Sequence, residues 1–581
     1  MKIKVAENTG FCMGVRKAVL NIVNKINNDT ETIYVYGPLI HNPQTIAILQ
    51  SRGLITIDSL ENIKGKTVAI RTHGIPRESL QILKQDALQI INLTCPRVAR
   101  VQGLVKKYSR DGYFIIIIGD DHHAEVESVK SYANSGVAVI ASIQDIQSIE
   151  KADKYIVVAQ TTFDEFLFEK ITKQLKAKFE NILIFNTICD STHKRQNDVI
   201  KAINEGIDTL IVVGGKNSAN TKRLASLGKN SDIKTFHIET EEELLDKDFK
   251  DSKYVLVTAG ASTPGWIINN VLEKLYAIST KYINPLLQII IHFLEIATRL
   301  NIISSLASFF MTLLIEHLTG IWSDYKLPSI SSLFIFIMYA VNNYFLKDTL
   351  KIANPFKYRI HNNNHYIILI STITAITASI IISYNIKSFA YTLIFYSILI
   401  AGMVFSTKQM QIIVDKFLPA FIQKIYAIKT IPANIGWITI SLLLPIVYSF
   451  EISSLEIASN ISSFSLIIFL SYIIISRNLL LDLIGFGGDL IFGNITLPIL
   501  FGLENIKKFF IIFSLLSIVP VMYLSVYNNI LYLLFILNIV YYYILFNKII
   551  KLTYFISLKY EILTDTNFIL LIILISVILS I

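Results

Sequence analysis

The chain has 581 residues and a formal net charge of +9, and 52% of its residues are hydrophobic. A mean hydropathy of +0.52 is high for a soluble protein, and the length exceeds that of one ordinary domain. The positive charge is spread along lysine-rich segments of the sequence. This distribution favours solubility and attraction to a membrane surface over nucleic-acid binding.

Apolar residues are unevenly distributed along the chain. Residues 1–280 mix charged helical patterns with short apolar strands, whereas residues 281–581 contain long runs of Ile, Leu and Phe. We therefore predict a soluble α/β domain followed by an all-α polytopic membrane domain. The N-terminus, MKIKVAENTG, has no apolar core typical of a secretory signal, so we expect a multi-pass membrane protein with its N-terminal domain in the cytoplasm.

The only three cysteines share one local setting. Cys12, Cys95 and Cys189 each follow a short apolar strand and open a helical pattern. An odd, sparse set argues against disulfides. Helix starts favour thiolates, and three thiolates with a missing fourth ligand suit a [4Fe–4S] cluster with one open iron. A zinc site with three cysteines and three buried structural cysteines stay as alternatives, although no CxxC or CxxH pair supports zinc.

Further polar side chains follow apolar runs in chain order. Strands that alternate with helices predict parallel α/β units, and we expect several small lobes around one central site. Imidazoles, small hydroxyls, an amide and helix-start N–H groups suit a phosphate or diphosphate, and a carboxylate beside histidines suits proton delivery. Taken singly, each of these residues is more often a helix cap or a structural residue. The candidates are His41, His73, His123, Glu125, Thr162, Ser218, Asn220 and Ser262.

Nine motifs within about residues 1–277 resemble one enzyme family. They are GFCMGVRKA, GPLIHNPQ, RTHGIP, LTCPRVARVQ, GDDHHAEV, QTTF, NTICDSTHKRQ, GGKNSANTKRL and TAGASTP. In order and spacing they are similar to 4-hydroxy-3-methylbut-2-enyl diphosphate reductases of the methylerythritol phosphate route to isoprenoids. The resemblance implies a three-lobed α/β fold around a [4Fe–4S] cluster. It also implies reductive loss of the allylic hydroxyl, giving isopentenyl and dimethylallyl diphosphates.

The resemblance also assigns roles to single residues. Cys12, Cys95 and Cys189 would bind the cluster, Glu125 would supply a proton, and Thr162 would lie near the substrate hydroxyl. No GxGxxG fingerprint for a dinucleotide stands out, so a ferredoxin or flavodoxin is the expected electron donor. A zinc-dependent hydrolase is the alternative for this half. The implied diphosphate ligands are His41, His73, His123, Ser218, Asn220 and Ser262.

The second half contains about eight or nine apolar runs of spanning length. Asp482 and Asp489 are seven residues apart, about two helical turns, so they could face one cavity and bind Mg²⁺. Their segment resembles the second Asp-rich motif of UbiA-type membrane prenyltransferases. In the first motif, however, Leu346 and Leu350 stand at the two spaced Asp positions. We expect a transferase-like domain. The alternative for this half is a membrane anchor or lipid-binding module. For the two acids alone, the alternative is that they are loop acids solvated at the interface.

Overall fold

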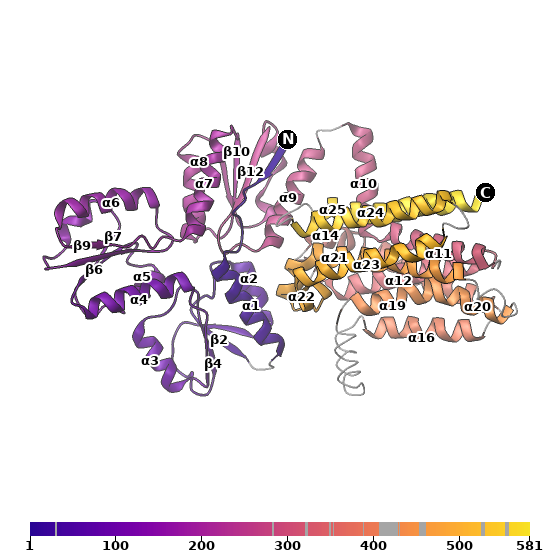
Figure 1. Ribbon diagram of the computed structural model, residues 1–581, viewed down its shortest axis with the longest axis horizontal. Coiled ribbons are helices and arrows are strands. Elements are labelled where there is room, and N and C mark those ends of the chain that lie inside the picture. Colours follow the sequence, from indigo (N-terminus) through magenta and orange to yellow (C-terminus); the bar gives the residue numbers. More distant parts are fainter. Residues whose placement is uncertain are drawn as a thin grey trace. The chain divides into compact units, whose positions relative to one another are not determined.

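The computed structural model describes the chain apart from residues 29–31, 282–283, 320–322, 348–349, 352–353, 387–388, 406–427, 429, 453–460, 525–528, 552–556 and 581. The chain divides into two compact units, Met1–Ile278 and Ser279–Ile581. The first unit is built from strands and helices, and the described elements of the second are helices (Figure 1). The predicted change from α/β to helical structure is confirmed.

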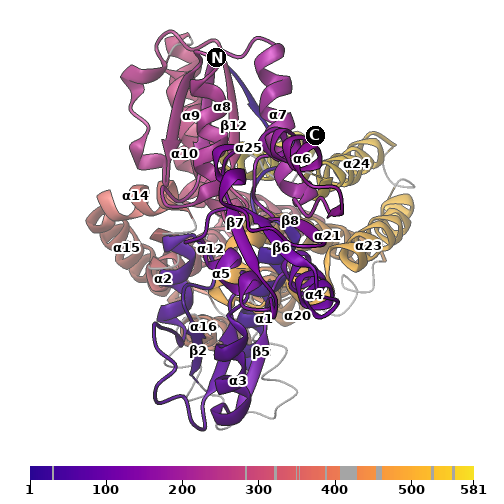
Figure 2. The same ribbon diagram turned by 90° about the vertical axis from the view of Figure 1, so that its left-hand side faces the viewer.

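The strands described in the first unit form three separate four-stranded sheets, with orders β1-β12-β10-β11, β3-β2-β4-β5 and β7-β6-β8-β9. Every pairing within them is parallel. Figures 1 and 2 show the sheets as three lobes. The strands are β1 (Lys2–Val5), β2 (Ile33–Tyr36), β3 (Leu54–Ile57), β4 (Thr67–Ile70), β5 (Gln89–Asn92), β6 (Phe114–Ile118), β7 (Val137–Ile140), β8 (Tyr155–Ala159), β9 (Ile182–Ile184), β10 (Thr209–Val213), β11 (Lys234–Ile238) and β12 (Tyr254–Ala259).

The composition of the interior strands explains this architecture. Every residue of β6 (FIIII), β8 (YIVVA) and β10 (TLIVV) is buried. Continuous apolar runs, rather than alternating ones, are typical of parallel strands that are covered on both faces. Parallel neighbours also require long crossover connections, which the intervening helices supply. They are α1 (Met13–Asn28), α2 (Pro43–Ser51), α3 (Arg77–Asp86), α4 (Pro96–Arg110), α5 (Ala124–Lys130), α6 (Glu165–Lys178), α7 (Asp190–Asn204), α8 (Ala219–Lys229) and α9 (Gly265–Thr280).

The position of a strand in its sheet separates two classes of candidate residue. Cys12, Cys95 and Cys189 follow β1, β5 and β9, which are edge strands of the three different sheets. The predicted polar ligands follow interior strands: β2, β4, β6, β8, β10 and β12. In parallel sheets these loops lie at the carboxyl ends of the strands, where open α/β folds place their sites. Each lobe therefore contributes one cysteine and several polar side chains.

The second unit is a helical bundle with broken helices. A π-helical segment, Thr439–Leu443, joins α19 to α20, and α10 bends by 70° from α11. Its helices are α10 (Pro285–Arg299), α11 (Ile302–Thr319), α12 (Lys326–Phe345), α14 (Pro355–Asn363), α15 (His365–Tyr384), α16 (Phe389–Phe405), α19 (Thr430–Ile438), α20 (Leu444–Ile452), α21 (Ile461–Phe492), α22 (Leu497–Phe501), α23 (Leu503–Leu524), α24 (Asn529–Lys551) and α25 (Ser557–Ser580).

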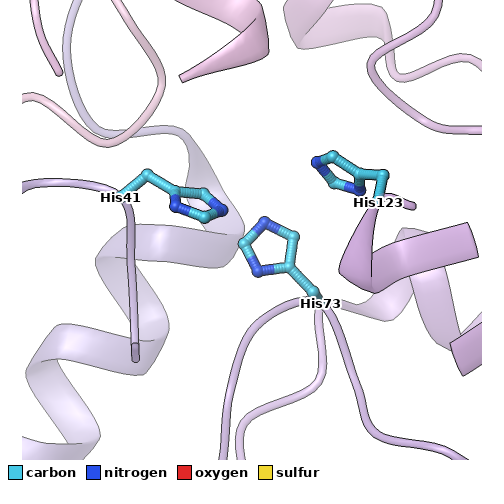
Figure 3. Close-up of side chains that lie close together, drawn as sticks. All are labelled: His41, His73 and His123. Carbon is cyan, nitrogen blue, oxygen red and sulfur yellow. The ribbon is translucent and has the colours of Figure 1, made fainter. Parts of the chain in front are cut away.

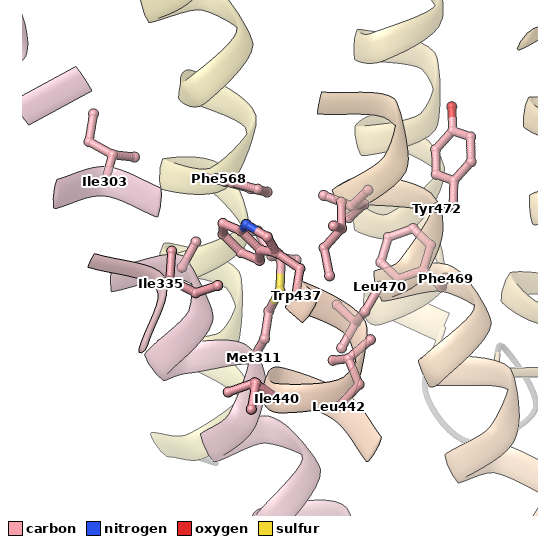
Figure 4. Packing of buried hydrophobic residues seen from close by; sticks show 14 of the residues in the cluster. Ile303, Met311, Ile335, Trp437, Ile440, Leu442, Phe469, Leu470, Tyr472 and Phe568 are labelled. Atoms are coloured by element: carbon pink, nitrogen blue, oxygen red, sulfur yellow. The ribbon is translucent and has the colours of Figure 1, made fainter. Parts of the chain in front are cut away.

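One continuous apolar core joins the helices of this bundle. Trp437 of α19 lies beside Phe568 of α25, with ring centroids 5.6 Å apart (Figure 4). Met311 of α11 and Phe469 of α21 belong to the same buried cluster. The outer faces are also apolar: Ile367 and Ile373 of α15, for example, are more than half exposed. Apolar residues on all sides of a helix are typical of membrane-spanning helices.

Five described helices are long and apolar enough to cross a membrane, and a sixth span results if the bent pair α10 and α11 counts as one. This assignment rests on length and composition. A shorter apolar helix lies at Tyr391–Ala401. Several apolar helices thus occupy residues 281–581, while the predicted number of eight or nine stays a prediction.

Candidate active site of the first unit

Backbone hydrogen bonds tie each cysteine loop to a neighbouring site loop. The Cys12 N–H donates to the Ala261 carbonyl at 3.0 Å, the Cys95 N–H to Thr72 at 2.9 Å, and the Cys189 N–H to Thr161 at 2.8 Å. The accepting residues directly precede three predicted site residues: Ser262, His73 and Thr162. The same connection between an edge-strand loop and an interior-strand loop therefore recurs once per lobe.

The three thiols are free and half-buried. A Cβ added at Gly14 would lie 2.7 Å from the Cys95 Sγ and 4.0 Å from the Cys12 Sγ, so both sulfurs flank the start of α1. Burial raises the pKa of the Cys95 thiol, N–H groups at the start of α4 oppose that shift, and Cys12 and Cys189 add repulsion. Both other cysteines thus lie near enough to Cys95 to act on its thiolate.

The donor set fits an iron–sulfur cluster better than a single zinc ion. Zinc held by three thiolates needs sulfurs only about 4 Å apart. Among the described residues, the three histidines form a group compact enough to hold one metal ion, and the cysteines do not. Three separated thiols at three helix starts can instead bind three irons of a larger cluster.

His41, His73 and His123 point their rings toward one another (Figure 3). Ring centroids are 4.8 Å apart for His41 and His73, 5.6 Å for His73 and His123, and 6.4 Å for His41 and His123. Burial lowers the pKa of each imidazole, and the nearby Arg71 guanidinium contributes to the lowering. At neutral pH the three rings are therefore neutral and can donate N–H groups to an anion.

The same three rings could in principle hold a cation, since their ligand nitrogens lie within 4.8 Å of one another. Two observations favour an anion. A tetrahedral zinc site would need nitrogens about 3.4 Å apart, and the positive charge of Arg71 opposes a metal ion but attracts a diphosphate. In addition, the His123 Nδ1 accepts the Glu125 N–H at 3.2 Å, so a neutral His123 ring carries its proton on Nε2. This nitrogen is then a donor.

Glu125 is buried, and among the described residues Thr161 donates both hydrogen bonds that its carboxylate accepts. Its Oε1 accepts the Thr161 N–H at 2.6 Å, and its Oε2 accepts the Thr161 hydroxyl at 2.8 Å. Burial raises the pKa of the Glu125 carboxyl, and the two bonds from Thr161 oppose the rise. The hydroxyl of Thr162 instead accepts a bond from the Gln160 Nε2 at 2.9 Å. Sequence reasoning selected Thr162 and missed the contact of Thr161 with Glu125. The sequence does not show which of two adjacent residues after a strand faces the site, because this depends on the conformation of the loop.

The start of α8, which follows β10, brings an unpaired amide to the site. Asn220 is 6% exposed, and both polar atoms of its side chain have no hydrogen-bond partner among the described residues. Ser218, the N-cap of α8, is also buried and makes no capping bond with its hydroxyl. The Ser262 hydroxyl donates to the His41 carbonyl at 3.0 Å, and a Cβ at Gly215 would lie 3.0 Å from that oxygen. Buried unpaired amides call for a bound partner, which an anionic ligand here would supply.

The first unit matches a known family over almost its whole length. The model of the family described as LytB protein matches residues 3–276. A 4-hydroxy-3-methylbut-2-enyl diphosphate reductase of Alkaliphilus oremlandii is 37% identical over 277 residues, which are 47% of this chain and 99% of the relative. The chain belongs to the LytB family.

Other LytB relatives have similar coverage. The reductase of the same name from Campylobacter jejuni subsp. doylei is 42% identical over 47% of this chain and 98% of its own length. A solved structure of (E)-4-hydroxy-3-methyl-but-2-enyl diphosphate reductase is 37% identical and covers 48% of this chain and 100% of its own, with a TM-score of 0.40.

The LytB match ends before the second unit, where the structure places the predicted acids on α21. Asp482 is 6% exposed and accepts a hydrogen bond from the Thr430 hydroxyl; Asp489 is 8% exposed and accepts the Asn494 Nδ2 at 2.7 Å. The interpretation as solvated loop acids is therefore wrong, since both residues are helical and buried. Gly485 lies between them, and a Cβ there would be 3.0 Å from the Asp489 Oδ2.

Proposed function

We propose that residues 1–277 reduce 4-hydroxy-3-methylbut-2-enyl diphosphate to isopentenyl and dimethylallyl diphosphates. LytB membership supports the reaction. The structural observation that carries the proposal is that, in each sheet, the cysteine and the polar side chains follow different strands. Edge strands of the three sheets lead to Cys12, Cys95 and Cys189, while interior strands lead to polar side chains that suit an anion. A redox group and a diphosphate site would thereby be assembled from different loops of the same three lobes.

The three cysteines would hold a [4Fe–4S] cluster. When bound, this group supplies electrons and an open iron for the allylic oxygen of the substrate. The diphosphate would be held by neutral imidazole N–H groups on one side. On the other side, the unpaired Asn220 amide and the hydroxyls of Ser218 and Ser262 would bind it. These contacts orient the hydroxyl end of the substrate away from the anion site.

Glu125 would supply a proton to the leaving hydroxyl. Its raised pKa lets this buried carboxyl hold a proton more readily than an exposed one. Thr161 orients it through two hydrogen bonds, and Thr162 is proposed to face the substrate hydroxyl. The balance requires two electrons and two protons, and the C–O bond breaks to release water. A ferredoxin or flavodoxin would deliver the electrons.

An anaerobic assay of the cluster-loaded full chain with reduced methyl viologen tests this proposal. We expect brown protein with about four irons that converts the substrate to both C5 diphosphates. The Cys12→Ser, Cys95→Ser and Cys189→Ser variants should each lose the cluster. A colourless protein that carries zinc, or loaded protein without turnover, would refute the reductase assignment and leave the zinc-dependent hydrolase as the alternative.

For the second unit we propose a UbiA-like membrane domain in which Asp482 and Asp489 bind Mg²⁺ and through it a prenyl diphosphate. The burial of both carboxylates in an apolar bundle supports this, because intramembrane acids are costly and generally functional. Leu346 and Leu350, at the positions of the first acid motif, weigh against transfer and favour a membrane anchor or lipid-binding module.

Electron paramagnetic resonance can measure the binding of Mn²⁺ in the presence of a prenyl diphosphate. This measurement distinguishes between the two functions proposed for the second unit. Binding that is lost in Asp482→Asn and Asp489→Asn but kept in Glu125→Gln would support the acid site. Absence of binding in the wild type would support the anchor. Whichever function the second unit has, we propose that the chain is a multi-pass membrane protein whose first unit lies in the cytoplasm.

A further inference from the structure

The exposed face of α1 is basic and lies directly beside a proposed cluster ligand. Met13, the residue after Cys12, is 70% exposed, and Arg16 and Lys17 on the next turn are also exposed. The helix contains no acidic residue. Neither Arg16 nor Lys17 forms an ion pair with a described residue, so both charges are available to a partner.

A shallow hollow of about 500 Å³ lies on this face. Phe11, Met13 and Leu20 line it with apolar surface, while Arg16 and Lys17 frame it with positive charge. The hollow begins at the residues on either side of Cys12. Gly14, on the buried side of the same turn, is so near the Cys95 sulfur that an added Cβ would lie 2.7 Å from it. A redox group that entered the hollow would therefore come close to two of the three proposed cluster ligands.

We propose that this α1 face, named here the α1 docking face (Phe11, Met13, Arg16, Lys17 and Leu20), binds a small acidic flavodoxin. This inference rests on the proposed reductase function. The apolar, exposed edge of a flavin fits the apolar hollow, and the acidic surface around the flavin complements Arg16 and Lys17. One electron passes per encounter, from flavin hydroquinone to the cluster, leaving the semiquinone. Two encounters supply the two electrons of each turnover, and no atoms are exchanged.

Charge reversal on the α1 docking face tests the proposal. In the cluster-loaded full chain, Arg16→Glu combined with Lys17→Glu should weaken the binding of oxidised flavodoxin about tenfold or more at low ionic strength. The effect should shrink as salt is added. Calorimetric titration gives the affinity, and stopped-flow absorbance gives the rate at which flavodoxin hydroquinone reduces the cluster. Turnover with methyl viologen, a small reductant that needs no docking face, should be unchanged.

Two further variants sharpen the test. Lys173→Glu combined with Lys176→Glu reverses the same charge on exposed positions of α6 and should leave flavodoxin affinity unchanged. Met13→Glu places a charge in the apolar hollow and should weaken flavodoxin binding even at high salt.

Equal losses in the α1 and α6 variants, or none in either, would overturn the docking face. A loss of affinity for a ferredoxin but not for flavodoxin would overturn the choice of a flavin carrier. Absence of turnover with methyl viologen in the wild type would instead refute the reductase function itself, so the two failures can be told apart.

Discussion

Thr161 and Thr162 are adjacent and chemically identical, yet the structure gives them different partners. Thr161 binds both oxygens of Glu125, whereas Thr162 accepts a bond from Gln160. The carbonyl of Thr161 also accepts the Cys189 N–H. One residue therefore connects the proposed proton donor to a proposed cluster ligand. Burial raises the pKa of the acid, and we expect the bonds from Thr161 to limit that rise.

Removal of the Thr161 hydroxyl should shift the pH dependence of turnover. The bond from this hydroxyl stabilises the Glu125 carboxylate, so its loss in Thr161→Val should raise the pKa of Glu125 further. The limb of the profile at which Glu125 loses its proton should then move to higher pH. The shift of this limb is measured from the pH profile of kcat/KM with methyl viologen as the reductant. Thr161→Ser should restore the wild-type limb, and Thr162→Val should leave its position unchanged; a shift in Thr162→Val alone would contradict this assignment.

The same raised pKa has a consequence for stability. The folded state binds the Glu125 proton more tightly than the unfolded chain, whose carboxyl has an ordinary pKa near 4.5. The favourable contribution is therefore complete below that pH and is lost as the pH rises through the raised folded value. At a pH above the folded pKa, the buried Glu125 carboxylate therefore lowers the stability of the folded state. We expect this of a residue that serves the reaction rather than stability.

A single methyl group at Gly14 should disturb cluster assembly. The added Cβ of Gly14→Ala would lie 2.7 Å from the Cys95 Sγ, so the sulfur or the start of α1 must shift. We expect fewer irons per chain and weaker visible absorbance. Gly103→Ala is the matched control: it lies inside α4, a Cβ there meets nothing within 4 Å, and the helix should gain about 0.5–1 kcal/mol. Equal iron contents in the two variants would contradict the proposed crowding.

At the scale of elements, α21 is held by polar contacts to several other helices. Arg477 donates to Asp565 of α25 at 2.9 Å, to the Tyr339 hydroxyl of α12 at 2.6 Å, and to Ser304 of α11 at 2.7 Å. Asn478 on the next position donates to Asn434 of α19 at 2.6 Å. Side chains from separate apolar helices thus converge on one guanidinium, which fixes the register of α21.

Breaking the Arg477–Asp565 pair should destabilise the second unit strongly. Both side chains are at most 2% exposed, and removal of one partner leaves the other charge buried, at a cost of about 3–5 kcal/mol. Arg477→Met and Asp565→Leu should each lower the thermal stability of the chain in detergent. The double variant should lose less than the sum of the two single losses. Additive losses would mean that the pair does not act as a unit.

The sequence predicted some elements well and others poorly, for physical reasons. Residues such as Cys12 and Cys95 could be found because each stands at a strand-to-helix change, a local signal that composition reveals. Whether a strand is at an edge or in the interior depends on pairing between distant segments, so the separation of cysteines from polar ligands could not be predicted. The Arg477–Asp565 pair joins residues 88 positions apart and was missed, although nearby Asp482 was selected.

At the scale of the whole molecule, the two units differ in composition and are separately compact. Relatives that are complete reductases align with the first unit over 98–99% of their length. A fragment of residues 1–281 should therefore fold alone, bind the same amount of iron as the full chain and keep its turnover with methyl viologen. Iron assay and turnover of the fragment, purified without detergent, measure this. A fragment that aggregates, or that needs the second unit for its cluster, would contradict it.

Because each lobe supplies one cysteine, the proposed cluster would also link the three lobes mechanically. Each sulfur follows an edge strand of a different sheet, so a bound cluster would fasten three lobes at a single point. Oxygen that destroys the cluster would then release this fastening as well as end turnover. Loss of the cluster would thus be expected to loosen the three lobes from one another as well as to stop catalysis.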